Sequence, residues 1–228
     1  MRKLFDLDNP VFQLISRLTD LAVLGLICMV CCVPVVTVGP AVTALFKTVH
    51  DLTIERGSSI VRTYFRAFRD NFKQAAIAWL LALLGFTSLA CDWLLLKLYF
   101  QGTAYTVLAW AVLGLALALE GLLCYLFPLI SRYDDTLRKH FHNAGLLMIR
   151  YFPKTLLMIL IQMLPLLMAS YMPYVLMQTL LFWILFCPGF SAQANVFLLR
   201  PIFQRLESGS ARETAEEKEM LDEAPEEE

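Results

Sequence analysis

Long apolar runs alternate with short polar stretches along the 228-residue chain. We identify five hydrophobic segments, at residues 18–46, 75–96, 103–127, 155–174 and 175–198. The last four are each long enough to cross a hydrocarbon core, which takes about 20 helical residues. The composition agrees, because 58% of the residues are hydrophobic and the mean hydropathy is +0.62, whereas soluble domains are roughly 45–50% apolar. The pattern predicts an all-α, multi-pass helical membrane protein.

The first hydrophobic segment contains helix breakers: Pro34, Gly39 and Pro40, with Thr37 among them. Residues 18–33 would form only about 24 Å of helix, short of a hydrocarbon core of roughly 30 Å. Pro34 disfavours an unbroken helix, whereas Gly39-Pro40 suits the start of a new one. We favour two shorter helices joined by an extended link at residues 35–38, which enter the membrane and return to the same side. A single span kinked by proline is the alternative.

Basic residues gather in two stretches, and their distribution predicts an orientation. Residues 47–73 contain six of them and residues 132–154 contain five. Lysine and arginine accumulate in cytoplasmic loops, so we expect both basic loops, and the side that carries Arg200 and Arg205, to be cytoplasmic. Arg2, Lys3 and Arg17 also prefer that side. A single first span would place them outside, so the sequence leaves the side of the N-terminus open.

The C-terminal residues differ in composition from the rest of the chain. Residues 207–228 contain ten acidic and two basic residues and little apolar content. Such a segment cannot bury enough surface to order itself. We therefore predict a helical membrane domain at residues 1–206 and a disordered acidic tail, on the cytoplasmic side, at residues 207–228.

A basic and aromatic stretch precedes the second hydrophobic segment. Its phenylalanines are spaced three and four residues apart, as on one face of a helix, and cations lie between them. We predict an amphipathic helix in the headgroup region rather than a nucleic-acid site, because the adjoining segment enters lipid. The residues that define this surface are Phe65, Arg66, Phe68, Arg69, Asn71, Phe72 and Lys73.

Acidic residues within the apolar segments are candidates for a polar intramembrane site, since a charge in the bilayer is costly unless it is paired or hydrated. Glu120 lies well inside the segment at residues 103–127 and is the strongest candidate. It could carry a proton or meet a polar ligand, or it could hydrogen-bond to a neighbouring helix. Asp92 lies near the outer end of its segment and is expected at the interface. Asp20 is expected to pair locally with Arg17.

No catalytic signature emerges from the chain, which contains no P-loop, H-E-x-x-H or G-x-S-x-G motif. All six cysteines lie in apolar segments, where a free thiol packs as a small hydrophobe. Asp134, Asp135, His140 and His142 form no complete ligand set, because histidines two residues apart diverge on a helix. We therefore expect no enzyme activity, no metal and no cofactor.

Three motifs are similar to those of a known family. They are Asp8-Asn9-Pro10, residues 34–40 followed by Ala44-Leu45, and Phe65-x-x-Phe68-x-x-Asn71-Phe72-Lys73-Gln74. On these motifs the chain resembles the YesL-like family of bacterial integral membrane proteins, whose function is unknown. The resemblance covers most of residues 5–200. It implies a multi-pass protein of the bacterial cell membrane and suggests a setting in carbohydrate transport, and it supplies no catalytic residues.

Two functions remain in contention from the sequence. The first is an accessory or scaffold protein, associated with carbohydrate uptake, that binds a membrane transporter subunit. The second is a small transporter or channel that uses the broken first segment and Glu120, as an oligomer formed by self-association. Both hypotheses have the lipid bilayer as a partner, and neither involves nucleic acid.

Overall fold

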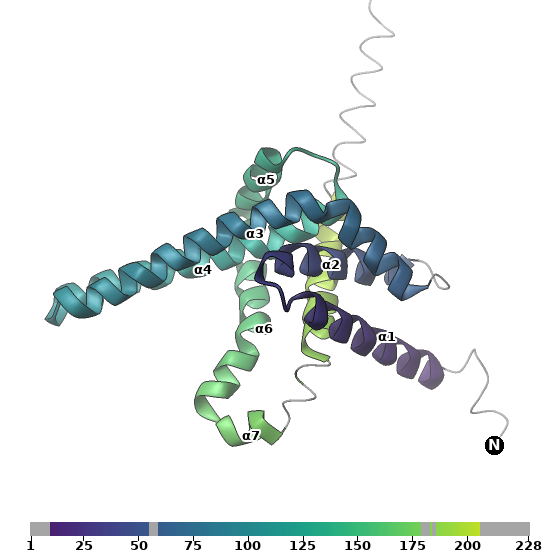
Figure 1. Ribbon diagram of the computed structural model, residues 1–228, viewed down its shortest axis with the longest axis horizontal. Coiled ribbons are helices and arrows are strands. Elements are labelled where there is room, and N and C mark those ends of the chain that lie inside the picture. Colours follow the sequence, from purple (N-terminus) through teal and green to yellow (C-terminus); the bar gives the residue numbers. More distant parts are fainter. Residues whose placement is uncertain (1–9, 55–58, 179–182, 184–185, 206–228) are drawn as a thin grey trace, which may run out of the picture.

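The computed structural model describes residues 10–54, 59–178, 183 and 186–205, and these residues are helical or irregular, with no strand. In chain order the elements are α1 (Pro10–Cys31), the 3-10 turn η2 (Val35–Thr37), α2 (Val38–Ile54), α3 (Ile60–Tyr99), α4 (Gly102–Arg132), α5 (Leu137–Arg150), α6 (Phe152–Tyr171) and α7 (Pro173–Gln178). A further helix covers residues 186–205. The prediction of an all-helical fold is confirmed for this part of the chain (Figure 1). The acidic tail at residues 207–228 lies outside the described residues.

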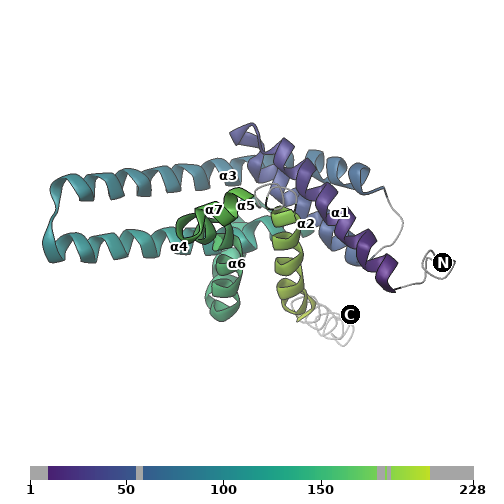
Figure 2. The same cartoon turned by 90° about the horizontal axis from the view of Figure 1, so that it is seen from below.

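Helices α3 and α4 form a long hairpin that projects away from the rest of the molecule in both views (Figures 1 and 2). The 40 residues of α3 would extend about 60 Å at 1.5 Å per residue. The chain reverses at Gly102, whose φ of 65° is the left-handed conformation that glycine adopts without strain. A narrow seam of buried residues, including Ala82, Leu89 and Ala109, joins the two helices in the projecting part.

The first hydrophobic segment is two helices, as predicted, but its link is not extended. Residues 35–37 form a 3-10 turn, and Pro34 before it has extended torsion angles, φ −75° and ψ 125°. Helix α2 begins at Val38, beside the glycine and proline expected to start it. Figure 1 shows that the chain reverses at this turn, so that α2 runs back along α1. A continuous span kinked by proline does not describe this segment.

The number of membrane spans differs from the prediction. Among the described residues, only α3 and α4 are single helices long and apolar enough to cross a bilayer, and α5 with the first part of α6 would add a third span. That pair is bent by 102° at its break. In Figure 1, α6 runs across the direction of the α3–α4 hairpin rather than along it. About five spans are therefore not confirmed; two or three helices of the described residues have the length and composition of a membrane span.

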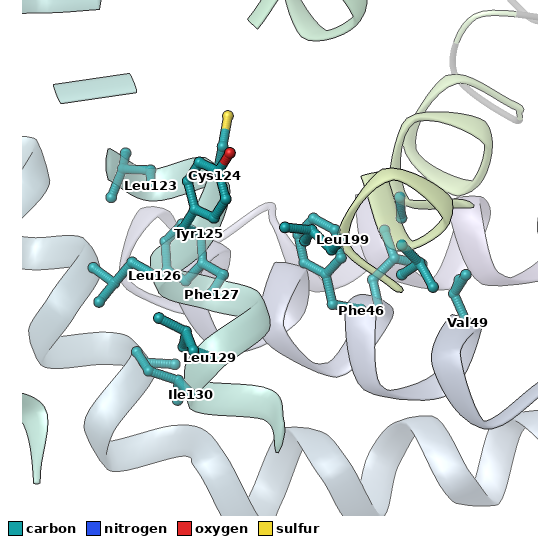
Figure 3. Packing of buried hydrophobic residues seen from close by; sticks show 14 of the residues in the cluster. Phe46, Val49, Leu123, Cys124, Tyr125, Leu126, Phe127, Leu129, Ile130 and Leu199 are labelled. Atoms are coloured by element: carbon teal, nitrogen blue, oxygen red, sulfur yellow. The ribbon is translucent and has the colours of Figure 1, made fainter. Parts of the chain in front are cut away.

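The core lies where α2 crosses the inner half of α3 and the last third of α4 (Figure 3). Residues 121–131 of α4 are buried except Leu122, which is half-buried. Helix 186–205 packs against both α2 and the end of α4, and Leu199 lies beside Phe46. The Tyr64 hydroxyl is buried here and donates a 3.1 Å hydrogen bond to the Ala41 carbonyl oxygen. The core thus fixes the C-terminal end of α4 between α2 and helix 186–205.

Candidate functional site

A pocket with a volume of about 120 Å³ opens where α2, the end of α4 and helix 186–205 meet. The apolar part of its wall is made by Phe46, Pro128, Val196, Leu199 and Phe203. The polar part is made by Lys47, His50, Asp51, Ser131, Arg132 and Arg200. These polar residues come from three separate regions of the chain, which the core packing brings together.

Arg132, the last residue of α4, is held in a defined position at this pocket. Its Nη1 lies 3.1 Å from Nε2 of His50 on α2. Its guanidinium carbon lies 4.9 Å from the ring centroid of Phe203, in cation–π geometry. Contacts with α2 and with helix 186–205 therefore fix the direction of the guanidinium, although the arginine side chain is long and flexible.

The hydrogen bond from Arg132 also fixes the tautomer of His50. Arginine has only donors, so the Nε2 atom of His50 must accept and carry a lone pair. The ring proton then sits on Nδ1, which lies 3.6 Å from the Asp51 carboxylate. In this arrangement the His50 ring orients Arg132, and the Asp51 carboxylate lies near the other ring nitrogen.

The permanent charges around the pocket are predominantly positive. Among the described lining residues, Lys47, Arg132 and Arg200 contribute three cations, against the single carboxylate of Asp51. Lys47 is half-buried and Arg200 is exposed. Neither of these two side chains makes an ion pair or a hydrogen bond to any other described residue. The Ser131 hydroxyl is uncharged and donates a 2.7 Å hydrogen bond to the Pro128 carbonyl oxygen in its own helix.

Glu120, the strongest candidate from the sequence, lies elsewhere, on the part of α4 nearest α6. It is half-buried and has no ion pair or hydrogen bond to another described residue. One helical turn later, the Cys124 thiol accepts a 2.9 Å hydrogen bond from the Gln162 side chain of α6. Glu120 therefore lies one helical turn from a polar contact that joins α4 to α6.

The two other acidic candidates are not brought together with Glu120. Asp92 is exposed in the projecting part of α3, one residue before Trp93, whose ring lies 5.7 Å from the Lys97 ammonium group. Asp20 is half-buried on α1, and no ion pair joins it to Arg17, which is also among the described residues. The local pair expected for Asp20 is therefore not formed.

The basic and aromatic stretch is the first part of α3 and is continuous with the span that follows, rather than a separate helix. Phe65, Phe72 and the cations Arg66, Arg69 and Lys73 are exposed, as an interfacial surface requires. Phe68 packs against the core and stacks on Tyr64, with ring centroids 6.4 Å apart. The Asn71 amide donates a 3.0 Å hydrogen bond to the Ala67 carbonyl oxygen of its own helix. This stretch therefore anchors α3 as well as carrying charge.

The broken link of the first segment is built into the interface between α2 and α3. The Thr37 hydroxyl donates to the Cys31 carbonyl oxygen at 2.6 Å and to the Pro34 carbonyl oxygen at 2.7 Å. Gly39 lies against α3, where an added Cβ would overlap the Ala75 carbonyl oxygen. The link is thus a packed and hydrogen-bonded element.

The histidines of the second basic loop diverge, as the spacing predicts. His140 is 1% exposed in the core-facing side of α5, whereas His142 is exposed. No group of three histidine, cysteine or carboxylate side chains that could hold a metal ion occurs in residues 10–54, 59–178, 183 and 186–205. The loop carboxylate Asp135 pairs instead with Lys139, at 3.2 Å.

Residues 19–93 match the model of a family described as a protein of unknown function, DUF624. This is the family to which YesL-like proteins belong. No curated protein and no solved structure matches the chain. The match covers the broken link, α2 with Lys47 and His50, and most of α3; Glu120, Arg132 and Arg200 lie outside it.

The sequence does not predict this pocket. It uses the three cations only to predict which side of the membrane the loops face. Lys47, Arg132 and Arg200 each end an apolar run, which is the pattern that the positive-inside rule describes. The signal that could have been used is the recurrence of a cation at the same end of three hydrophobic segments. Such cations share one side of a helical bundle, where they can converge.

Proposed function

We propose that this chain is an accessory or scaffold protein of the bacterial cell membrane that binds another membrane protein through the α3–α4 hairpin. One observation carries the proposal: the hairpin projects beyond the bundle (Figures 1 and 2), and large apolar side chains along it are exposed. Leu84, Leu98 and Trp110 are 68%, 70% and 68% exposed. The protein acts by association and has no catalytic activity of its own.

One face of α4 suits a helix of a partner. Val107, Trp110, Gly114 and Leu117 follow each other at helical spacing, and all four are exposed. An added Cβ at Gly114 would meet nothing within 4 Å. In membranes, small residues allow close approach of two helices, and large apolar neighbours supply the packing. Lipid covers an apolar face equally well, so the experiment must separate a protein neighbour from lipid.

The test places a photoreactive amino acid at Val107 in the full chain and crosslinks it in native membranes. We expect a discrete adduct with a second membrane protein. A reactive residue at Ile149, which is 72% exposed on α5, is the matched control and should not give that adduct. Gly114→Leu should abolish the adduct, while Ala90→Leu on the exposed surface of α3 should retain it. An adduct that persists in Gly114→Leu contradicts the proposal. Crosslinking to lipid alone contradicts it as well.

The setting in carbohydrate uptake rests on the resemblance to YesL-like proteins, and the same adduct tests it. Mass spectrometry of the crosslinked partner should identify a subunit of a sugar importer. Deletion of the chain should then lower the abundance or the transport rate of that importer. An adduct that contains only a second copy of this chain would contradict the accessory function and indicate self-association instead.

A small transporter is the second candidate, and the polar groups between α4 and α6 favour it. Glu120 lies one helical turn from the Cys124–Gln162 hydrogen bond, inside a helix long and apolar enough to cross a membrane. A transporter should move a radiolabelled sugar into liposomes without any partner, and Glu120→Gln should reduce that flux. Asp92→Asn, in the exposed part of α3, is the control expected to leave it unchanged. No flux from the reconstituted wild-type chain would exclude this candidate.

A further inference from the structure

We propose that the pocket between α2, the end of α4 and helix 186–205 binds a phosphate-bearing anion. The proposal is independent of the accessory function, because it concerns the opposite end of α4 from the projecting hairpin. Its basis is the convergence of three cations on one cavity.

The charge of the lining argues for an anion. Lys47, Arg132 and Arg200 face the cavity with only Asp51 in opposition, and neither Lys47 nor Arg200 makes an ion pair with another described residue. A half-buried cation such as Lys47 is stabilised by a counter-charge, since partial desolvation raises the cost of leaving it alone. A bound anion would supply that counter-charge to all three cations together.

The geometry argues for an oxyanion rather than a halide. Arg132 is held by His50 at 3.1 Å and by the Phe203 ring, so its planar fork has a defined direction. A guanidinium in a fixed direction recognises carboxylate or phosphate oxygens with paired hydrogen bonds. Lys47 and Arg200 add donors from two other elements, and donors from several directions match the tetrahedral oxygens of a phosphate.

The size of the pocket also fits. Its volume of about 120 Å³ far exceeds the roughly 10–15 Å³ that a single water requires. A phosphate group therefore has room, and its ester substituent can lie along the apolar wall made by Phe46, Val196 and Leu199. Both an anionic phospholipid headgroup and a soluble phosphate compound offer this chemistry.

The first arm of the test uses the purified full chain in a non-ionic detergent, with inorganic phosphate as the probe. Thermal unfolding is followed by tryptophan fluorescence, against sodium chloride of equal ionic strength. A ligand that binds only the folded state raises Tm as its concentration exceeds Kd. We expect phosphate, and not chloride, to raise Tm if the site takes a soluble compound.

The second arm uses nanodiscs that contain phosphatidylcholine alone or phosphatidylcholine with phosphatidylglycerol. Native mass spectrometry then counts the lipids that remain on the protein. Selective retention of phosphatidylglycerol, with no effect of inorganic phosphate, would assign the site to a lipid headgroup. Failure of both probes would overturn the proposal.

Variants decide whether either probe occupies this pocket. Arg200→Gln and Lys47→Gln should each weaken binding about tenfold or more, the effect of losing one hydrogen bond to a charged group. Asp51→Asn should strengthen binding, because it removes the only carboxylate among the described residues of the lining. Arg138→Gln, exposed on α5 outside the pocket, should leave binding unchanged. Equal binding by the wild-type protein and both cation variants would also overturn the proposal.

Discussion

The indole Nε1 of Trp79 on α3 donates a 2.7 Å hydrogen bond to the carbonyl oxygen of Val35 in the 3-10 turn. The same carbonyl accepts the backbone N–H of Val38, so both of its lone pairs are used. A break in an apolar helix exposes carbonyl groups that lipid cannot satisfy. The side chain of a neighbouring helix therefore completes the hydrogen bonding of the link between α1 and α2.

The first prediction concerns this hydrogen bond. Trp79→Phe keeps an aromatic side chain but removes the donor, so we expect the free energy of unfolding to fall by about 1 kcal/mol. Loss of part of the ring packing against Phe127, whose centroid lies 6.5 Å away, adds to the effect. Chemical unfolding of the detergent-solubilised protein measures the change. Trp110→Phe, at an exposed position, is the control, and an equal loss there would contradict the role of the bond.

Close packing at Gly39 gives the second prediction. An added Cβ would overlap the Ala75 carbonyl oxygen and lie 2.6 Å from the Cβ of Trp79. Because backbone atoms cannot move aside as a flexible side chain does, Gly39→Ala should separate α2 from α3. We expect a destabilisation of about 1–3 kcal/mol, the range of overpacked cores. Thermal unfolding measures it as a lower Tm.

Gly114→Ala is the matched control for Gly39→Ala, since both glycines are helical. Nothing lies within 4 Å of an added Cβ at Gly114. The substitution should be neutral, or stabilising by up to about 1 kcal/mol through helix propensity. Similar Tm values for Gly39→Ala and Gly114→Ala would show that α2 and α3 do not approach as closely as described.

The third prediction tests the contact between α1 and helix 186–205. Gly189 lies so close to α1 that an added Cβ would overlap the Leu21 carbonyl oxygen and lie 3.2 Å from the Leu21 Cβ. Gly189→Ala should loosen this contact and lower Tm, with a cost of about 1–3 kcal/mol. Protection of helix 186–205 from hydrogen exchange should fall with it, while protection in α3 is retained. Unchanged exchange would argue against this packing.

Local signals in the sequence predicted the break in the first segment, because proline and glycine act on the backbone where they stand. Pro34 and Gly39-Pro40 correctly indicated two helices. The predicted extended form of the link was wrong. Residues 35–37 form a 3-10 turn, in which the Thr37 hydroxyl reaches the Cys31 carbonyl oxygen. The role of Gly39 as a point of close approach was also invisible, since it depends on Ala75, which lies in another helix.

The span count and the pocket depend on tertiary arrangement, and hydropathy alone does not contain it. The run at residues 155–174 is apolar enough for a span, yet α6 begins at a sharp bend after α5 and crosses the hairpin direction (Figure 1). Lys47, Arg132 and Arg200 are 85 and 68 residues apart in sequence, so no short motif joins them. By contrast a lone charge in an apolar run is visible in the sequence itself, and Glu120, which the sequence singles out, is half-buried on α4.

The last prediction concerns the cap that the Thr37 hydroxyl forms on the end of α1. Thr37→Val preserves the shape of the side chain but removes the donor to the Cys31 and Pro34 carbonyl oxygens. The Cys31 carbonyl oxygen then loses this donor, whereas the Pro34 carbonyl oxygen keeps the Thr37 backbone N–H. We expect a loss of about 1–3 kcal/mol in the free energy of unfolding. Thr106→Val is the matched control, because that exposed hydroxyl makes one 3.3 Å bond within its own helix. Hydrogen exchange of α1 and α2 locates the effect: faster exchange at the start of α2 in Thr37→Val alone supports the cap, whereas identical exchange in the two variants contradicts it.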